Sequence, residues 1–442
     1  DTMNAMHRFF FYFRAFVRCL ATTSSPIVLS FDDLHAADSA ALELLRTLVA
    51  DVETSNILFI GCYRDSQVGP DHPIHQEILN LTSAGVNIQT LALSNISEEH
   101  MNTLIADTLY LSPFVTRSLS KTVQSKTGGN PLFSLQFLRS LLDEKLLHYS
   151  AKSRRWEWDV EQIEAKDVAD NVVDLLTEKM LKLSPDAQYL LKVLSCLGSR
   201  CEMSTIHALS SDGISNTNPV LEEIITEGFV SRDRAYYKFS HDQVQEAAYA
   251  LIPSDERESL HLSIGKLLWG KMTGPDLDSC LHTIVDQIGR GIKFMTDHEE
   301  KLRFASLCLM AGKKAMASSS FLPAAINLLQ GTMMLQDSDW ERNDATYNLC
   351  LDLTSSCCQA QYASGNYDGV MLSSKPIFLH AKTLQDKMRG HYAIMTSLAA
   401  QGKLFDTIKY GLKVLDGLGE SLPINPNNLH AIFGFVRTRF ME

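Results

Sequence analysis

The stretch that decides the fold runs Ile27-Val28-Leu29-Ser30-Phe31-Asp32-Asp33-Leu34-His35-Ala36-Ala37-Asp38. Its first five residues form a short apolar run, which is typical of a buried parallel strand. Two carboxylates follow, and open α/β sheets bind ligands at the carboxyl ends of their strands. In a site that handles phosphate, Asp32 can hold Mg²⁺ and Asp33 can orient or deprotonate an attacking water. The plainer alternative is that two acidic residues simply end a strand.

The sequence on either side alternates between helix and strand patterns. Apolar residues recur at helical spacing over residues 3–21, before the first strand, and again after Asp38, a good N-cap. A second apolar run, residues 57–63, ends at Arg64-Asp65. A helix near residues 72–83 and a third strand at 86–93 complete the alternation. Strands and helices that alternate over short connections predict a parallel α/β sheet.

A largely helical region follows from Ser97. The run Thr127-Gly128-Gly129-Asn130-Pro131 breaks the pattern, and Pro131 suits the first position of a new helix. Residues 170–252 carry four amphipathic helix patterns and one hairpin pattern, in which residues 229–232 pair with residues 236–239. Helices followed by a small hairpin describe a winged-helix module.

Residues 254–442 read as one helix after another. Two segments are self-similar, Ala363-Ser364-Gly365-Asn366-Tyr367-Asp368 and Ala400-Gln401-Gly402-Lys403-Leu404-Phe405, and their glycines are 37 residues apart. That spacing is close to the 34-residue tetratricopeptide period. Small residues at such corners let two helices pack closely. The pattern therefore predicts an irregular α-helical repeat solenoid.

The composition sets outer bounds on function. The chain has 442 residues, 45% of them hydrophobic and 21% charged, which indicates a globular protein of two to four domains. A net charge of −12 disfavours a nucleic-acid partner, because phosphate binding requires clustered Lys and Arg. Nine cysteines without a C-x-x-C pair indicate reduced thiols and a cytoplasmic location, with Cys357 and Cys358 buried in a helix. No segment reads as a membrane span, and we expect the chain to be part of a longer protein.

Four segments carry a family resemblance: FDDLHAADSAALELL, ILFIGCYRDSQV, TGGNPLFSLQFL and FSHDQVQEAAYALI. In this order they resemble the signal-transduction P-loop ATPases of the STAND class, above all the predicted ATPase modules of large serine/threonine-kinase and histidine-kinase receptors. The resemblance covers about residues 1–252. It implies a partial P-loop NTPase α/β core (1–95), a helical lid (96–150), a winged-helix module (151–252) and tetratricopeptide-like repeats (253–442).

The resemblance also implies roles for individual residues. Asp32 matches the Mg²⁺-associated Walker B acid, and Asp33 matches the acid that orients water. Arg64 falls where the family places a sensor near the γ-phosphate; its plainer alternative is a surface ion pair. Pro131 matches the lid proline that packs against adenine, and its alternative is simple helix initiation. His241 matches the histidine that reaches the β-phosphate of ADP, whereas a lone histidine is more often structural.

Two departures from the family pattern stand out. No G-x-x-x-x-G-K-[ST] occurs, so the loop whose backbone amides cradle phosphates is absent from this sequence. Since the helix at 3–21 should directly precede the Walker B strand, we expect that loop upstream of Asp1. Ala36 replaces a bulky tryptophan common in the family, which affects local packing more than chemistry.

The combined interpretation is an ATP/ADP-controlled signalling switch that hydrolyses ATP in the intact protein. Mg-ATP would favour an open form, and ADP held by the lid and His241 a closed one. The repeats would bind a protein partner, and nucleotide-dependent self-association is also implied. Two alternatives stay open: a non-catalytic repeat scaffold with a decayed ATPase core, and a winged-helix transcription regulator, against which the acidic charge counts.

Overall fold

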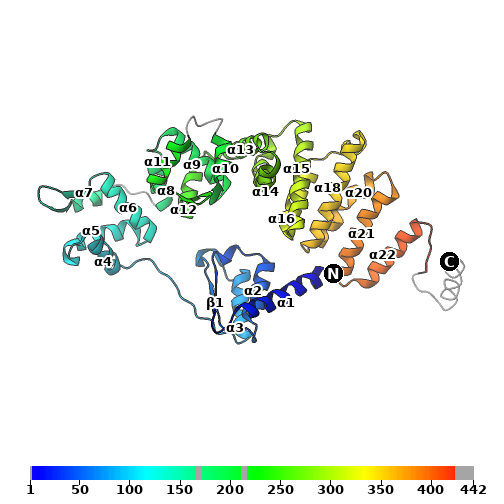
Figure 1. Ribbon diagram of the computed structural model, residues 1–442, viewed down its shortest axis with the longest axis horizontal. Coiled ribbons are helices and arrows are strands. Elements are labelled where there is room, and N and C mark those ends of the chain that lie inside the picture. The colour runs from blue at the N-terminus through cyan, green and yellow to red at the C-terminus, as the bar shows by residue number, and fades with distance from the viewer. Residues whose placement is uncertain (1, 166–170, 211–216, 424–442) are drawn as a thin grey trace. The chain divides into compact units, whose positions relative to one another are not determined.

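The computed structural model describes residues 2–165, 171–210 and 217–423. These residues are mostly helical and carry small sheets of two or three strands (Figure 1). The chain divides into two compact units: residues 1–93 together with 395–442, and residues 94–394. The partial α/β core predicted from the sequence falls in the first unit.

The first unit begins with the predicted alternation of helices and strands. Its elements are α1 (Thr2–Leu20), β1 (Ile27–Phe31), α2 (Ser39–Val49), β2 (Ile57–Gly61) and α3 (Pro73–Ser83). Strands β1 and β2 pair in parallel, from Ile27 opposite Ile57 to Phe31 opposite Gly61. Asp38 caps α2 as predicted, since its Oδ1 accepts from the Ala41 N–H at 2.8 Å. The predicted parallel pairing of these two strands is confirmed.

Two expectations for this sheet are wrong. Residues 86–93 form no strand, and their apolar side chains point to solvent, with Leu91 and Leu93 83% and 89% exposed. An apolar run becomes a strand only where a neighbour supplies ladder hydrogen bonds, and none of the described residues does so here. The first two strands are also not buried on both faces, because Val28 and Leu58 are more than half exposed.

The second unit opens with a helical segment and a hairpin. Its elements are α4 (Glu98–Leu109), α5 (Pro113–Thr127), α6 (Pro131–Asp143), β3 (Leu147–Ser150), β4 (Arg155–Trp158) and α7 (Val160–Ala165). The predicted break before α6 is present. Gly128 and Gly129 have positive φ angles of 59° and 74°, and a Cβ on Gly129 would lie 2.2 Å from the Ile96 carbonyl oxygen. Only glycine fits this second position without displacing the neighbouring backbone.

The next region is a compact mixed module. It contains α8 (Val172–Met180), α9 (Pro185–Leu197), β5 (Arg200–Glu202), α10 (Met203–Ser210), α11 (Thr217–Thr226), β6 (Val230–Asp233), β7 (Tyr236–Phe239) and α12 (Asp242–Ala250). The predicted hairpin is confirmed as antiparallel β6 and β7. The sequence indicated four helices where the structure has five. It also offered no sign of β5, which pairs with β7 to give the strand order β5-β7-β6.

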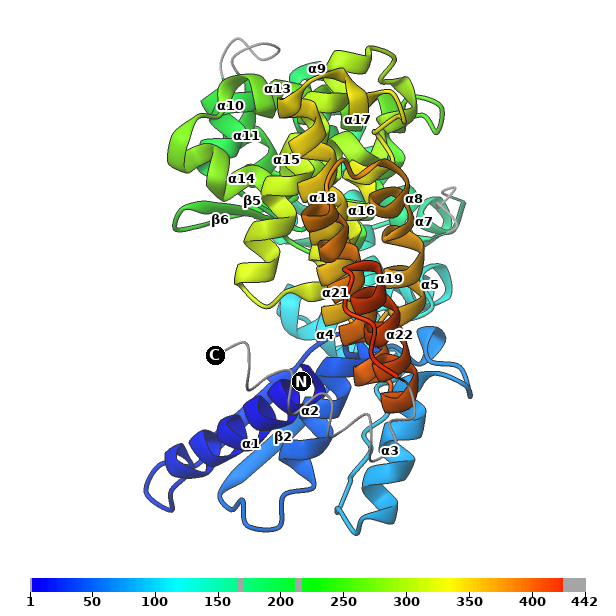
Figure 2. The same ribbon diagram turned by 90° about the vertical axis from the view of Figure 1, so that its right-hand side faces the viewer.

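A run of helices completes the described chain, and its last helix belongs to the first unit. It comprises α13 (Arg257–Lys271), α14 (Gly274–Arg290), α15 (His298–Ala317), α16 (Phe321–Thr332), α17 (Asp339–Arg342), α18 (Asp344–Ala363), α19 (Tyr367–Ser373), α20 (Lys375–His380), α21 (Leu384–Ala400) and α22 (Leu404–Gly417). Helices α15, α16 and α18 pack against one another (Figure 2). Cys357 and Cys358 are buried thiols in α18, as predicted.

The two predicted corner glycines occupy equivalent turns. Gly365 and Gly402 have φ angles of 79° and 74°, and in each turn the next residue donates its N–H to a carbonyl five positions back. A third corner has the same geometry, with Ser319 (φ 59°) in the glycine position. These turns follow α18, α21 and α15 respectively, so the corner geometry recurs along the array.

Candidate functional site

The site is built on the turn that follows β1. Asp33 adopts a left-handed backbone conformation, with φ 50° and ψ 42°, and its N–H donates to Asp32 Oδ1 at 2.9 Å. The Leu34 N–H then donates to the Cys62 carbonyl at 2.9 Å, which extends the pairing beyond both strands. Aspartate and asparagine are among the residues other than glycine that adopt this conformation most readily, because their short side chains can hydrogen-bond to the local backbone.

Two side chains converge on the Asp33 carboxylate. Arg64 Nε and His35 Nε2 each lie 3.7 Å from Asp33 Oδ1. The Arg64 backbone N–H faces His35 Nδ1 at 3.4 Å. Because Nδ1 is the acceptor in that contact, the proton of a neutral His35 lies on Nε2, facing Asp33. The strand ends therefore bring together Asp33, Arg64 and His35, which we call the strand-end cluster.

The strand-end cluster is open to solvent. The Asp33 and Arg64 side chains are 49% and 46% exposed, whereas His35 is only 11% exposed. Exposed ion pairs contribute little to stability, so the arrangement is not explained by folding energy alone. Sequence reasoning picked out Asp32, Asp33 and Arg64 and missed His35. The signal that could have found it was its place three residues after Asp32, on the loop that leaves the strand.

The cluster matches part of what a bound metal–nucleotide pair needs. Carboxylate oxygens are the ligands that Mg²⁺ prefers, and Asp32 and Asp33 supply them. No group of three or more His, Cys, Asp or Glu side chains forms a metal cage among the described residues. The phosphate-cradling motif is absent from the sequence. The residues present therefore suit a Mg²⁺ bound largely by phosphate and water, with one or two protein carboxylates.

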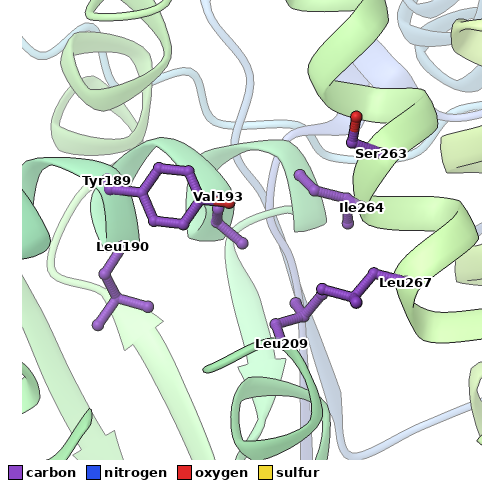
Figure 3. Close-up of a pocket in the computed structure, with 7 residues that line it drawn as sticks. All are labelled: Tyr189, Leu190, Val193, Leu209, Ser263, Ile264 and Leu267. Atoms are coloured by element: carbon purple, nitrogen blue, oxygen red, sulfur yellow. The ribbon is translucent and has the colours of Figure 1, made fainter. Parts of the chain in front are cut away.

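A pocket elsewhere in the chain is too small for a nucleotide. It lies between α9 and α13, lined by Tyr189, Leu190, Val193, Leu209, Ser263, Ile264 and Leu267 (Figure 3). Its volume is about 60 Å³. Sites for drug-sized ligands span roughly 300–1,000 Å³. This pocket is therefore a packing gap between helices, not a nucleotide site.

The remaining predicted site residues lie in the second unit. Pro131 is exposed at the first position of α6, after the Asn130 cap. His241 is exposed and caps α12, with its Nδ1 accepting from the Gln243 N–H at 3.1 Å. A neutral His241 therefore carries its proton on Nε2, which is a hydrogen-bond donor. Because the strand-end cluster belongs to the first unit, a site shared by all these residues remains a prediction.

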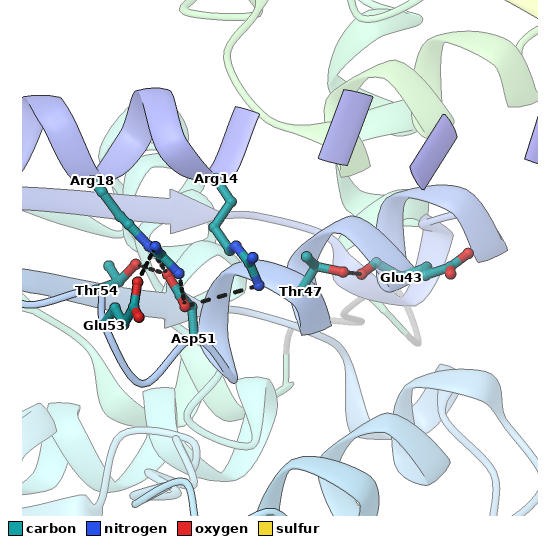
Figure 4. Close-up of polar contacts among 7 residues, drawn as sticks. All are labelled: Arg14, Arg18, Glu43, Thr47, Asp51, Glu53 and Thr54. Carbon is teal, nitrogen blue, oxygen red and sulfur yellow. Dashed lines mark hydrogen bonds and ion pairs between the residues drawn. The ribbon is translucent and has the colours of Figure 1, made fainter. Parts of the chain in front are cut away.

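A separate polar cluster holds α1 to the loop after α2 (Figure 4). Arg18 Nε donates to Asp51 Oδ2 at 2.5 Å, and Thr54 also donates to Asp51. The Asp51 side chain is only 3% exposed. The hydrogen bond from Arg18 is the main reason that the pKa of Asp51 falls to about 2. This cluster is structural, since the buried carboxylate already has its partners.

The chain is similar over part of its length to two curated proteins. No family model matches it. It is 26% identical over 336 residues to hybrid signal transduction histidine kinase G of Dictyostelium discoideum, covering 62% of this chain and 10% of that protein. It is 21% identical over 361 residues to the peroxide stress-activated histidine kinase mak3 of Schizosaccharomyces pombe, and the match covers 77% of this chain and 14% of that protein. The chain thus spans about a tenth to a seventh of these relatives.

The chain is also similar to solved structures. One of them is the crystal structure of a Signal Transduction ATPase with Numerous Domains (STAND) protein with a tetratricopeptide repeat sensor from Pyrococcus horikoshii. Sequence identity is 12%, the TM-score is 0.35, and the match covers 89% of this chain and 62% of the other. Within the described part of the chain, no helix combines the length and apolar character needed to cross a membrane.

Proposed function

We propose that the chain is the regulatory part of an ATP/ADP-controlled signalling switch. The observation that carries this proposal is the strand-end cluster, in which an aspartate at the carboxyl ends of two parallel strands faces an arginine and a histidine. Open α/β sheets bind their ligands at this end of the strands, which supports a ligand site here.

Asp33 and Arg64 of the cluster and three residues outside it have roles in this proposal. Asp32 would hold Mg²⁺, and Mg²⁺ bound there would neutralise charge on the phosphates. Asp33 would orient the attacking water, because its carboxylate is held in place by the backbone turn and by its two neighbours. Arg64 would lie near the γ-phosphate and stabilise charge there. Pro131 and His241 would contact the adenine and the β-phosphate from the second unit.

The relatives support a signalling context. Both are named as histidine kinases, one of signal transduction and one activated by peroxide stress. The chain matches only a small share of each, so we assign it a controlling role and place kinase output in other parts of such proteins. The helical array would bind a protein partner, since stacked helices present long surfaces for that purpose.

A pair of substitutions tests the assignment in a protein that carries this chain together with a phosphate-binding loop. Asn tolerates the left-handed conformation of Asp33 but lacks the basic oxygen. Asp33→Asn should therefore keep Mg-ATP bound and slow hydrolysis by about 10²-fold or more. Asp32→Ala should instead weaken Mg²⁺-dependent binding. The measurements are ATP affinity and phosphate release.

Asp65→Asn is the matched control, because it removes a neighbouring carboxylate at the other strand end and should leave both quantities unchanged. Parent-like hydrolysis in Asp33→Asn and Asp32→Ala would remove the ATPase assignment. A non-catalytic helical scaffold would then be favoured.

A further inference from the structure

A buried chain of hydrogen bonds crosses four helices of the second unit. The Tyr249 hydroxyl on α12 lies 3.1 Å from His261 Nε2 on α13. His261 Nδ1 lies 2.7 Å from Gln287 Oε1 on α14. Gln287 Nε2 donates to the Cys196 carbonyl oxygen at the end of α9 at 2.8 Å. We call this series of contacts the His261 chain.

The direction of every bond in the His261 chain is fixed by its last member. A carbonyl oxygen only accepts, so the Gln287 amide nitrogen must face Cys196 and its oxygen must face His261. His261 Nδ1 therefore carries the proton, and Nε2 accepts from the Tyr249 hydroxyl. The Cys196 carbonyl lies in the last turn of α9, where the helix itself offers no donor. Each polar group of the chain is satisfied by the next.

The chain is deeply buried, and the backbone is shaped to allow it. His261 and Gln287 are 2% and 1% exposed. A Cβ on Gly265, one turn after His261, would lie 2.6 Å from Ile288 Cγ1 and 3.2 Å from Gln287 Cβ. This glycine lets α14 approach α13 closely enough for Gln287 to reach His261. Since a buried polar group is costly without a partner, the contacts form together in one arrangement.

The chain connects two differently packed bodies. Most of the mixed module from α8 to α12 shares a core with the preceding helices. A second core holds α13, α14 and the first part of α15, and it also takes in Val193 of α9 and Leu209 of α10. Only residues 251–256 link α12 to α13. The apolar seam between α9 and α13 contains the gap of about 60 Å³ (Figure 3) and so is incompletely filled. Apolar packing is non-directional and does not by itself select one orientation across such a seam.

We propose that His261 is a positioning residue that locks the mixed module and the first helices of the array into one rigid arm. Rotation at the seam would break the two directed hydrogen bonds that cross it, Tyr249 to His261 and Gln287 to Cys196, and the bond between His261 and Gln287 holds these two together. A displacement of the module is therefore passed to the array. The proposal does not depend on nucleotide binding, because it concerns how the two bodies move together.

The test is a distance distribution across the seam. Spin labels attached to genetically encoded non-canonical amino acids, not to cysteines, are placed at the exposed positions Glu222 and Asp276. Each label reports on one of the two bodies. A second pair at Glu222 and Arg234 lies within the module and should not change. We expect one narrow distribution across the seam in the parent chain. His261→Leu should broaden it and lower the melting temperature by about 2–6 °C.

Leu267→Ala is the matched control, because it removes apolar contact at the same seam and leaves the His261 chain intact. It should lower the melting temperature without broadening the distribution. Tyr249→Phe removes a single hydroxyl and should broaden it less than His261→Leu; this variant serves if His261→Leu does not fold. Unchanged distributions in the His261 and Tyr249 variants, or equal broadening in Leu267→Ala, would overturn the proposal.

Discussion

The buried carboxylate of Asp51 holds α1 to the loop after α2. Its carboxylate receives hydrogen bonds from Arg18 and Thr54, and its pKa falls from 3.8 to about 2. A lowered pKa means that the folded state holds the proton less tightly than the unfolded state. The pair therefore stabilises the fold above about pH 4, and that contribution is lost as the pH falls towards 2.

Asp51→Asn should consequently lower the melting temperature at pH 7, and the difference from the parent should shrink progressively as the pH falls from about 4 to 2. Calorimetry from pH 2 to 7 measures this. Glu53→Gln is the control, since Glu53 is 75% exposed and pairs with the same arginine, and it should have little effect at any pH. A pH-independent loss in Asp51→Asn would show that packing, not charge, was removed.

The acidic pair at residues 32–33 illustrates what sequence can and cannot supply at this scale. An apolar run followed by two acids was enough to predict their place at a strand end. The contact of Asp33 with Arg64 depends on the register between two strands whose paired residues are 30 positions apart. No local pattern in the sequence encodes that register.

At the scale of elements, close helix crossings determine how the array packs. Gly312 in α15 lies against α16, and a Cβ there would lie 2.3 Å from Leu328 Cγ. Gly270 in α13 is exposed and has nothing within 4 Å of the same position. Both glycines lower the stability of a helix through their low helix propensity, but the space beside Gly270 is open and the space beside Gly312 is filled.

Gly270→Ala should stabilise the chain by about 0.5–1 kcal/mol, because alanine is the better helix former and meets no obstacle. Gly312→Ala should destabilise it by about 1–3 kcal/mol, because the added methyl forces Leu328 out of place. Denaturant unfolding of both variants measures the difference. Equal effects of the two substitutions would contradict the packing described for α15 and α16.

The elements that were predicted wrongly or missed from the sequence have identifiable causes. Residues 86–93 have the composition of a strand, but pairing is a property of the neighbour, and none was visible from the run itself. Strand β5 is only three residues long and too short to show a period of two. The corner at Ser319 escaped notice because serine occupies the position where glycine marks the other two turns. For residues 86–93 and for β5, pairing with a neighbouring strand, not local preference, decides the structure.

At the scale of the whole molecule, the predicted nucleotide contacts are divided between the two units. The strand-end cluster lies in the first, whereas Pro131 and His241 lie in the second. In the proposed switch, the closed state is the one in which both units hold the same nucleotide. A ligand shifts such an equilibrium only by as much as its affinity differs between the two states. In the proposed switch, the contact from His241 to ADP is the interaction that differs most directly between the closed and open states.

His241 also has a structural role, which any test must separate from binding. Its Nδ1 caps α12, so His241→Ala removes the cap and the free Nε2 donor together. Asparagine is among the best N-caps, so His241→Asn keeps the helix start while shortening the reach of the side chain. Helix integrity can then be checked by circular dichroism, and any change in nucleotide affinity that both variants share belongs to the imidazole.

The most direct measurement is the ratio of ADP to ATP affinity in a protein that carries this chain with its phosphate-binding loop. A hydrogen bond to a charged group is worth roughly 1.5–3 kcal/mol, and each 1.4 kcal/mol changes affinity tenfold. Both His241 variants should therefore lower the affinity for ADP by about 10–100-fold and lower the affinity for ATP much less. Equal weakening of the two nucleotides, or none, would contradict a switch in which His241 holds the ADP-bound state closed.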